Sequence, residues 1–242
     1  MGDVHVWLLD LRRAHVDLPD LYRVLDSEER ARVARFRRSE DGERFVAARG
    51  ALRSLIADQV GAEPAEVRFS HGPHGKPFLA APAGSPLQFN LAHSGRLVLI
   101  AMGWGLEVGV DVERGTSDAT IDELSGIVLC AREARQVERS GRISRRRTFV
   151  RFWTRKEAYL KADGRGLALP LSHLDLSRRG GRAAIFDPNA RSWKLCPRWR
   201  VRSLGLGRSY GAAVAAEGGG WHVIGHRWSS VGSREAYRIA PV

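Results

Sequence analysis

The sequence predicts a mixed fold of helices and strands, an α/β protein of the α+β type. Strand-like and helix-like segments follow one another without the regular alternation of a doubly wound parallel sheet. The chain has 242 residues, 43% of them hydrophobic and 27% charged, which suffices for one large domain or two small ones. Residues 44–52 and 151–159 also echo each other, since both begin Arg-Phe and carry a basic residue sixth and Ala eighth. Such an echo arises by chance or by duplication, and duplication predicts two similar halves.

Local patterns predict the first elements. Residues 4–8 alternate between two faces, as in a strand. Residues 26–37 are expected to form a helix, with Ser27 as the N-cap and acidic residues in the first turn. A second helix is predicted over residues 43–60, because its apolar residues form one stripe, and Gly61 ends it.

The later elements are predicted in the same way. A turn-rich stretch at 71–78 follows a short strand at 67–70, and two helices are expected around 120–139 and 145–163. The other segments are apolar or alternating and are bounded by turn residues, so we expect them to be strands. They are residues 87–94, 97–103, 106–114, 193–205, 209–218 and 221–230.

The formal net charge of +12 at pH 7 is unusual. It indicates either a solvated surface or an acidic or polyanionic partner: nucleic acid, an anionic membrane, a phosphorylated cofactor or an acidic protein. The two cysteines, Cys130 and Cys196, have no Cys or His at zinc-ligand spacing, which argues against a structural zinc site. The N-terminus lacks a signal-peptide pattern, and the longest apolar run, residues 97–106, is too short to span a bilayer. We therefore expect a soluble cytoplasmic protein.

Clustered acidic residues stand out in so basic a chain. Asp111 and Glu113 are two apart in the predicted strand 106–114, so they share one face, while Val110 and Val112 point to the other. Two neighbouring carboxylates repel unless a cation lies between them, and hard oxygen ligands favour Mg²⁺. The alternative is an exposed strand face whose charges nearby arginines balance.

Residues 152–163 add a third carboxylate. On a helix, Trp153, Glu157 and Lys161 are spaced by four and share one stripe. An ordinary surface Glu–Lys pair explains the charges but not the bulky Trp153. A carboxylate and an amine at the edge of a core instead suit a site that holds a metal and a phosphate together.

Two loops have the character of anion-binding segments. His93 and Ser94 lie on the turn that follows a strand, where they could face a phosphate, and Lys76 is presented by the Gly- and Pro-rich stretch 72–78. Taken singly, each of these residues is equally consistent with a solvated loop side chain.

Four motifs occur together in an order that resembles a known family. They are GKPF at 75–78, FNLAHSG at 89–95, GVDVER at 109–114 and FWTRKEAYLKADGRGL at 152–167. In order and spacing they resemble the 4′-phosphopantetheinyl transferases, specifically the two-domain surfactin-type subfamily. The resemblance covers about residues 7–215.

The resemblance implies a pseudo-twofold pair of α/β subdomains, which we place at 1–106 and 107–242, with coenzyme A between them. The 1–106 part would hold the adenine and 3′-phosphate end of coenzyme A, and the 107–242 part the metal site. The implied reaction is Mg²⁺-dependent transfer of 4′-phosphopantetheine to a serine of an apo acyl or peptidyl carrier protein, which releases adenosine 3′,5′-bisphosphate. A monomer is implied, and the carrier could serve fatty acid, polyketide, nonribosomal peptide or siderophore biosynthesis.

The resemblance also implies roles for individual residues. The metal-associated carboxylates would be Asp111, Glu113 and Glu157, and Glu157 would also take the serine proton, directly or through water. The coenzyme would be contacted by cationic side chains and a hydroxyl. These are Lys161 at the pyrophosphate, His93, Arg30, Arg32 and Arg44 near the 3′-phosphate, Lys76 near the adenine, and Ser94. One departure is Ala92, where the family often has Ser, and a backbone N–H, Ser94 or an arginine is expected to replace that hydroxyl.

Two other functions use some of the same features. A Mg²⁺-dependent nuclease would need the acidic residues and would explain the positive charge. One common nuclease arrangement places Glu and Lys two apart on a strand, whereas Glu157 and Lys161 are four apart in a helical segment. A non-catalytic nucleic-acid-binding protein has no use for the acidic residues, and the chain carries no helix-turn-helix or RNA-recognition signature.

Overall fold

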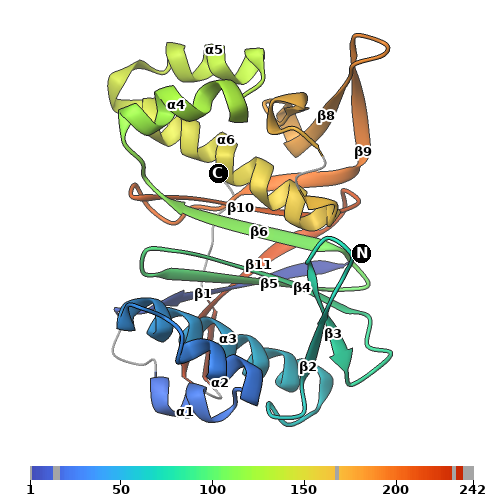
Figure 1. Cartoon of the computed structure of the whole chain (residues 1–242). Coiled ribbons are helices and arrows are strands. Elements are labelled where there is room, and N and C mark those ends of the chain that lie inside the picture. Colours follow the sequence, from blue (N-terminus) through green and yellow to red (C-terminus); the bar gives the residue numbers. More distant parts are fainter. Residues whose placement is uncertain (1, 13–16, 167–168, 231–232, 237–242) are drawn as a thin grey trace.

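The computed structural model describes residues 2–12, 17–166, 169–230 and 233–236. Residue 167, the last of the motif 152–167, lies outside these ranges. Two five-stranded sheets form the middle of the molecule, and helices cover their outer faces (Figure 1). The fold is therefore mixed α/β, as predicted.

The first sheet has the strand order β12-β11-β1-β5-β4. Its neighbours pair antiparallel except for β1 and β11, which run parallel with Trp7 opposite His226. The bounds are β1 Asp3–Asp10, β4 Leu87–Ser94, β5 Leu97–Trp104, β11 His222–Ser230 and β12 Ser233–Ala236. Strands β11 and β12, from the second half of the chain, thus complete the sheet that contains β1.

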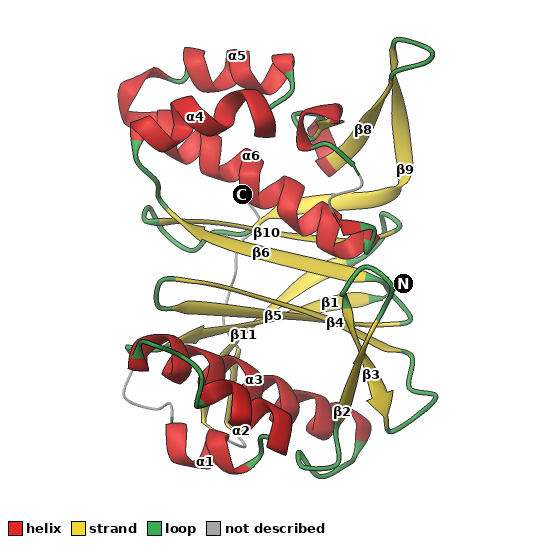
Figure 2. Cartoon of the chain, viewed as in Figure 1, coloured by secondary structure: helices red, strands yellow, loops and turns green. Residues whose placement is uncertain are grey.

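Three helices cover the outer face of the first sheet (Figure 2). They are α1 Leu18–Arg23, α2 Ser27–Val33 and α3 Ser39–Val60, and a separate hairpin, β2 Arg68–His71 with β3 Pro77–Ala81, lies beside them. The long helix α3 buries its apolar stripe, with Leu52 and Ile56, against Leu9, Val98 and Ile100 of the sheet. Helix α3 ends where predicted, because Gly61 takes the left-handed conformation with φ 68°.

The second sheet has the strand order β6-β10-β9-β8-β7, and all its pairs are antiparallel. Its strands are β6 Val108–Arg114, β7 Leu174–Asp175, β8 Arg182–Asp187, β9 Ser192–Ser203 and β10 Tyr210–Glu217. Helix α6 Gly141–Asp163 lies on its outer face, and α4 Asp118–Val128 and α5 Ala131–Arg139 pack against the far side of α6 (Figure 2). Two short 3-10 turns, η2 Leu171–His173 and η3 Arg179–Gly181, flank β7.

The inner faces of the two sheets pack on each other through small and branched side chains. Val6 and Leu99 of the first sheet lie in one buried cluster with Val110, Val112 and Val214 of the second. The layers are therefore helix, sheet, sheet and helix (Figure 1). The boundary between the sheets does not coincide with the expected division at residue 106, because β11 and β12 belong to the first sheet. That division and the pseudo-twofold relation of two halves stay predictions.

Several local predictions differ from the structure. The single helix expected around 120–139 is two helices, α4 and α5, because the backbone is extended at Leu129 and Cys130. His93 and Ser94, expected on a turn, are the last residues of β4.

The helix expected over 26–37 is α2, which ends at Val33, and its N-cap is Asp26 rather than Ser27. Asp26 accepts from Glu29 N at 2.9 Å, and the Glu29 side chain accepts from Asp26 N at 3.0 Å. This reciprocal capping box satisfies two N–H groups at once, so it outcompetes a serine cap one residue later.

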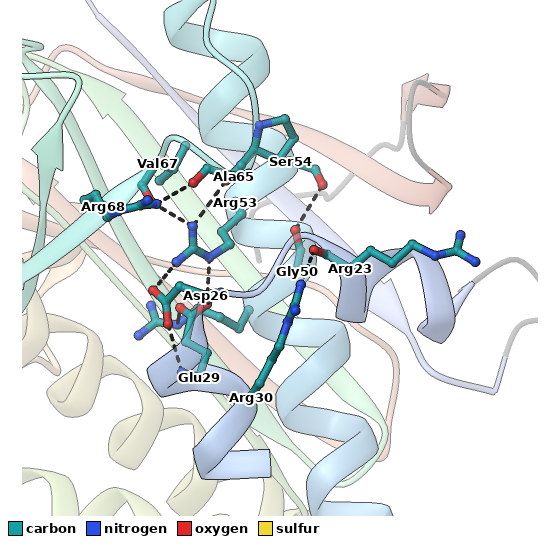
Figure 3. Close-up of polar contacts among 12 residues, drawn as sticks. Arg23, Asp26, Glu29, Arg30, Gly50, Arg53, Ser54, Ala65, Val67 and Arg68 are labelled. Atoms are coloured by element: carbon teal, nitrogen blue, oxygen red, sulfur yellow. Dashed lines mark hydrogen bonds and ion pairs between the residues drawn. The ribbon is translucent and has the colours of Figure 1, made fainter. Parts of the chain in front are cut away.

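Arg53 ties α2, α3 and the segment before β2 together (Figure 3). Its fully buried guanidinium donates to Glu29 Oε2 at 2.7 Å and to Val67 O at 2.6 Å, and it also pairs with Asp26. Paired and hydrogen-bonded in this way, the buried charge is compensated. The network fixes α2 against α3.

Gly109 allows α6 to lie directly on β6. A Cβ built at this position would be 2.2 Å from the carbonyl oxygen of Ala158 and 2.3 Å from the amide nitrogen of Ala162. Because these are backbone atoms, only a shift of the helix could accommodate the methyl group. This close approach sets the spacing of α6 from the β6 residues that face it.

We expect Gly109→Ala to destabilise the fold by about 1–3 kcal/mol through overpacking. The matched control is Gly126→Ala in α4, where a Cβ meets nothing within 4 Å and where alanine favours the helix. Thermal unfolding of both variants, followed by circular dichroism, checks the prediction. Equal melting temperatures for the two variants would contradict the packing account.

Both cysteines, Cys130 and Cys196, are free. Within the described ranges, no helix combines the length and apolar character that crossing a membrane requires.

Candidate active site

Strands β4 and β6 meet side by side along a seam between the two sheets, joined through side chains. Asn90 Oδ1 accepts from Val110 N at 2.9 Å, and Ser94 Oγ accepts from Arg114 N at 3.0 Å. Ser94 also donates to Glu113 Oε2 at 2.9 Å. Ser94 was predicted as a site residue and Asn90 was not, although a polar residue within a buried strand is a usable signal.

Asp111 and Glu113 share one face of β6, as predicted, while Val110 and Val112 enter the core between the sheets. Asp111 Oδ1 accepts from Lys161 Nζ at 2.7 Å, with the Asp111 side chain only 5% exposed. Its other oxygen, Oδ2, is buried and has no hydrogen-bond partner among the described residues. A buried carboxylate oxygen without a partner is costly, so it points to a cationic ligand.

Asp111, Glu113 and Glu157, here called the acidic cluster, influence one another electrostatically. Burial raises the pKa of each carboxyl above its usual range and is the first cause in every case. Repulsion from Asp111 adds to the rise in pKa at Glu113 and Glu157, and Lys161 opposes the rise at all three. Burial and mutual repulsion thus make it costly for the three carboxyl groups to be ionised together.

Helix α6 positions Glu157 and Lys161 one turn apart. Phe152 is buried, and Trp153 packs edge-on against Phe149 with ring centroids 5.6 Å apart, so the aromatic pair anchors the helix. The Lys156 ammonium, one residue before Glu157, lies 2.6 Å from Glu133, and both side chains are fully buried. The side chain next to Glu157 is therefore structural, while Glu157 itself stays half-buried at the cleft.

His93 lies near two cations, Arg44 and Lys161. Arg44 Nε donates to Gly95 O at 2.9 Å, which holds the guanidinium beside the turn after β4. Desolvation lowers the pKa of His93, and repulsion from Arg44 and Lys161 lowers it further, which favours the neutral ring. These three residues, all expected at the coenzyme, are brought together next to the acidic cluster.

Lys76 forms an ion pair and a hydrogen bond at the C-terminal end of α6. Its Nζ lies 2.7 Å from Glu107 Oε2 and donates to Ala162 O at 3.0 Å. It caps one of the last carbonyl groups of α6, and it lines a cavity together with Glu157 and Lys161.

Arg30 and Arg32 have local contacts on the outer helices. Arg30 donates to Arg23 O at 2.7 Å and lies 5.4 Å from the centroid of the Tyr22 ring, whereas Arg32 lies 5.0 Å from that of Phe45. Within the described residues, no hydrogen bond or ion pair joins either to the acidic cluster. Ala92 lies in the core between the sheets, with Ser94 two residues further on the same face of β4.

Cavities open at both ends of the seam. The first, the lysine cavity, has a volume of about 340 Å³ and is lined by Lys76, Asn90, Glu157 and Lys161, among others. The second, the arginine cavity, has a volume of about 560 Å³ and lies beyond Gly95. The acidic cluster lies between them along β6, since Asn90 contacts Val110 and Ser94 contacts Glu113.

One other group of potential metal ligands lies apart from the seam. Cys130, Glu133 and Asp175 offer atoms within 4.8 Å of one another, and in the described part of the chain they are the one group of three or more potential ligand residues this close. Lys156 already neutralises Glu133 there, and Leu176 N donates to it at 2.8 Å. We assign this group to packing of the helices. The carboxylate oxygens of the acidic cluster do not all lie within 4.8 Å of one another, and the Lys161 ammonium pairs with Asp111 there.

Comparisons with known proteins give one consistent family. Residues 107–215 match the model of the 4′-phosphopantetheinyl transferase superfamily, and residues 14–104 match the model described as 4′-phosphopantetheinyl transferase, N-terminal. The chain is 36% identical over 222 residues to the 4′-phosphopantetheinyl transferase HetI of Nostoc sp., covering 90% of both chains. It is 28% identical over 169 residues to the 4′-phosphopantetheinyl transferase Sfp of Bacillus subtilis, covering 69% of this chain and 73% of that protein.

Proposed function

Because the chain belongs to the 4′-phosphopantetheinyl transferase superfamily, we propose that its acidic cluster catalyses Mg²⁺-dependent transfer of phosphopantetheine from coenzyme A. The acceptor is a serine hydroxyl of an apo acyl or peptidyl carrier protein. The family relationship supports the modification of carrier proteins as the activity. The metal, the coenzyme contacts and the roles of individual residues are the proposal's own additions.

The observation that carries the proposal is the unpartnered Asp111 Oδ2 in a cluster of three carboxyl groups with raised pKa values. Carboxylate oxygens are ligands that suit Mg²⁺, which typically binds few carboxylates together with substrate phosphates. Asp111, Glu113 and Glu157 would therefore hold the ion. When bound, Mg²⁺ supplies charge neutralisation to the pyrophosphate.

The chain's own residues then bind, orient and move a proton. Glu157 accepts the proton of the serine hydroxyl, directly or through water, because a carboxylate with a raised pKa is a better base. The serine oxygen forms a bond to the phosphorus that carries the pantetheine arm. The bond from that phosphorus to the bridging oxygen breaks, and adenosine 3′,5′-bisphosphate leaves with the electron pair.

Cationic side chains would bind the coenzyme around this centre. Lys161 would contact the pyrophosphate, and Arg44 and His93 the 3′-phosphate, which their proximity supports. Lys76 would lie near the adenine, in the lysine cavity. Ser94 would assist through its hydroxyl. Arg30 and Arg32 stay candidates at the 3′-phosphate on the family resemblance alone.

Intact-mass measurement of an apo carrier protein tests this function. Incubation with the protein, coenzyme A and Mg²⁺ should add about 340 Da to the carrier, the mass of a transferred phosphopantetheine arm. Chelation of the metal should prevent the gain. No gain with a panel of apo carriers from fatty acid, polyketide and nonribosomal peptide synthesis would overturn the proposal. Cleavage of plasmid DNA under the same conditions would favour the nuclease alternative.

Lys161→Met should lower the transfer rate about 10²-fold at saturating coenzyme A, because a charge aimed at the transferring phosphoryl group is lost. Single-turnover transfer, followed by the mass of the carrier, measures this step. The control is Lys194→Met, since Lys194 pairs with Asp187 on the β8–β9 hairpin. An unchanged rate for Lys161→Met would remove this residue from the mechanism.

The proposal also includes the expectations that the protein acts as a monomer in the cytoplasm, without nucleic acid, and that its functional halves divide near residue 106. Size-exclusion chromatography with light scattering tests the oligomeric state.

A further inference from the structure

Helix α6 carries a second set of charged side chains on the side away from the acidic cluster. Arg151 and Arg155 are four residues apart, and Arg155 comes two residues before Glu157. Because two residues turn an α-helix by about 200°, the stripe of Arg151 and Arg155 lies nearly opposite the stripe of Glu157 and Lys161. Arg155 Nη1 donates to Ser203 Oγ at 3.4 Å, at the end of β9 rather than at β6. These two arginines therefore lie outside the proposed transfer site.

A third arginine comes from the segment after β7. Arg178 Nε lies 3.3 Å from Oδ2 of Asp175, whose side chain is almost completely buried. Asp175 also attracts the Arg155 guanidinium, and Arg151 repels it. Arg151, Arg155 and Arg178, here called the arginine triad, thus gather around one buried carboxylate.

The arginine triad is short of hydrogen-bond acceptors. The Nε atoms of Arg155 and Arg178 are both buried, and neither has a hydrogen-bond partner among the described residues. The contact of Arg178 with Asp175 is an ion pair by distance, but the Nε–H is not aligned for a hydrogen bond. Asp175 Oδ1 is occupied by Ser177, whose N and Oγ donate to it at 2.9 Å and 2.6 Å. Because a buried donor without an acceptor is costly, these N–H groups point to an acceptor from outside the chain.

The arginine triad also carries more positive charge than its neighbours neutralise. Glu133, the other acidic residue that attracts Arg155, is already paired with the Lys156 ammonium at 2.6 Å. Among the described residues this leaves Asp175 against three guanidinium groups, an excess of two positive charges. Burial lowers the pKa of Arg155 to about 10, and repulsion from Arg151 lowers it further. The Arg155 guanidinium is still protonated at pH 7, so its charge requires compensation.

We propose that the arginine triad binds a phosphate group, held by Arg155 and Arg178 with Arg151 at the exposed edge. A phosphate group carries a charge of about −1.5 to −2 at pH 7, which matches the excess more closely than the single charge of a carboxylate. Its oxygens can accept from two planar guanidinium groups at once. Arg151 is exposed and the Arg178 side chain is 33% exposed, so the ligand can approach from solvent. This binding is separate from the transfer reaction and does not depend on it.

Nitrogen-15 NMR of the arginine Nε–H groups tests the proposal at single residues. Inorganic phosphate is titrated into the unaltered protein at pH 7 with chelator present, and Arg155→Gln and Arg178→Gln identify the two resonances by their loss. Both resonances should shift saturably, with half-saturation below about 10 mM phosphate. The internal control is Arg53, whose buried Nε donates to Glu29 Oε2 at 2.7 Å and whose resonance should not move. The absence of a saturable shift at both Arg155 and Arg178 would overturn the proposal.

Thermal unfolding provides a second measurement, because a ligand that binds only the folded protein raises the melting temperature. At about tenfold the half-saturating concentration, phosphate should raise the melting temperature of the unaltered protein by about 3 °C more than that of Arg178→Gln. Arg191→Gln is the charge-matched control, since Arg191 is exposed on the turn between β8 and β9, and it should respond to phosphate like the unaltered protein.

Two other outcomes would count against the proposal. An equal rise in melting temperature for the unaltered protein and Arg178→Gln would be the general effect of phosphate as an excluded salt, and would overturn it. Acetate is titrated in parallel, and equally strong saturable shifts at Arg155 and Arg178 would show that the triad takes a carboxylate instead. Neither outcome affects the proposed function, which fails only if the unaltered protein adds no mass to any carrier.

Discussion

Glu157→Gln should lower phosphopantetheine transfer by about 10²- to 10⁴-fold, the range for loss of a positioned general base, and should leave the protein at least as stable as before. Burial and repulsion from Asp111 raise the pKa of Glu157, so its ionised form carries an electrostatic cost in the folded state. Glutamine keeps the shape and removes that cost. Transfer rates from carrier mass and melting temperatures from circular dichroism measure the two effects.

The stability effect has a definite pH dependence in metal-free protein. A carboxyl whose pKa is raised by folding contributes stability below its unfolded pKa, and loses that contribution as the pH rises through its folded pKa. The melting temperature of Glu157→Gln should therefore exceed that of the unaltered protein most at pH 8, and the difference should shrink towards pH 4. Chelator is present throughout, so that no metal stabilises the carboxylate. A lower melting temperature for the variant at pH 8 would contradict the assignment of Glu157 as an uncompensated charge.

Lys156→Met, one residue earlier, should have the opposite effect. The Lys156 ammonium lies 2.6 Å from Glu133, and both side chains are fully buried. It also donates to Val128 O and Leu171 O, each at 2.7 Å. Removing one partner of a buried pair costs about 3–5 kcal/mol, because the other charge is left uncompensated. Urea unfolding should show this loss, while transfer per folded molecule stays near that of the unaltered protein.

The double variant Lys156→Met, Glu133→Gln is the control for this loss. Glutamine removes the buried charge, and its one carbonyl oxygen can keep either the bond from Cys130 N or the bond from Leu176 N, which Glu133 accepts through different oxygens. The double variant should therefore regain part of the lost stability. If the double variant is as unstable as Lys156→Met, the loss arises from packing rather than from the orphaned carboxylate. If Lys156→Met loses transfer but not stability, the division of roles between adjacent residues is wrong.

The sequence predicted the parts of the site that depend on local periodicity. The strand alternation correctly separated Asp111 and Glu113 from Val110 and Val112, because side chains alternate strictly along a strand. The spacing of Glu157 and Lys161 predicted that both share one side of the helix, whereas their place beside Asp111 was implied by the family resemblance. The end of α3 at Gly61 also followed from local backbone preference.

What the sequence could not predict depends on contacts between distant segments. Nothing local indicates that β11 pairs with β1, or that Arg53 lies fully buried between Glu29 and Val67. Lys156 and Glu157 are adjacent charged residues in the sequence, and nothing local shows which of them is buried. Only the pairing of Lys156 with the buried Glu133 makes Lys156 structural. The arginine cavity could not be predicted for the same reason, since its residues come from α1, α3, β6, β10 and the loops beside them, which only the tertiary fold brings together.

The central claim is that Asp111 helps to hold a Mg²⁺ ion on which transfer depends, and a magnesium titration of the transfer rate tests it most directly. The rate is followed through the mass of the carrier for the unaltered protein and for Asp111→Asn, which keeps the size of the side chain but weakens it as a metal ligand. We expect the half-saturating Mg²⁺ concentration to rise at least about tenfold in the variant. Identical magnesium curves for the two proteins, or full transfer by the unaltered protein in excess chelator, would contradict the claim.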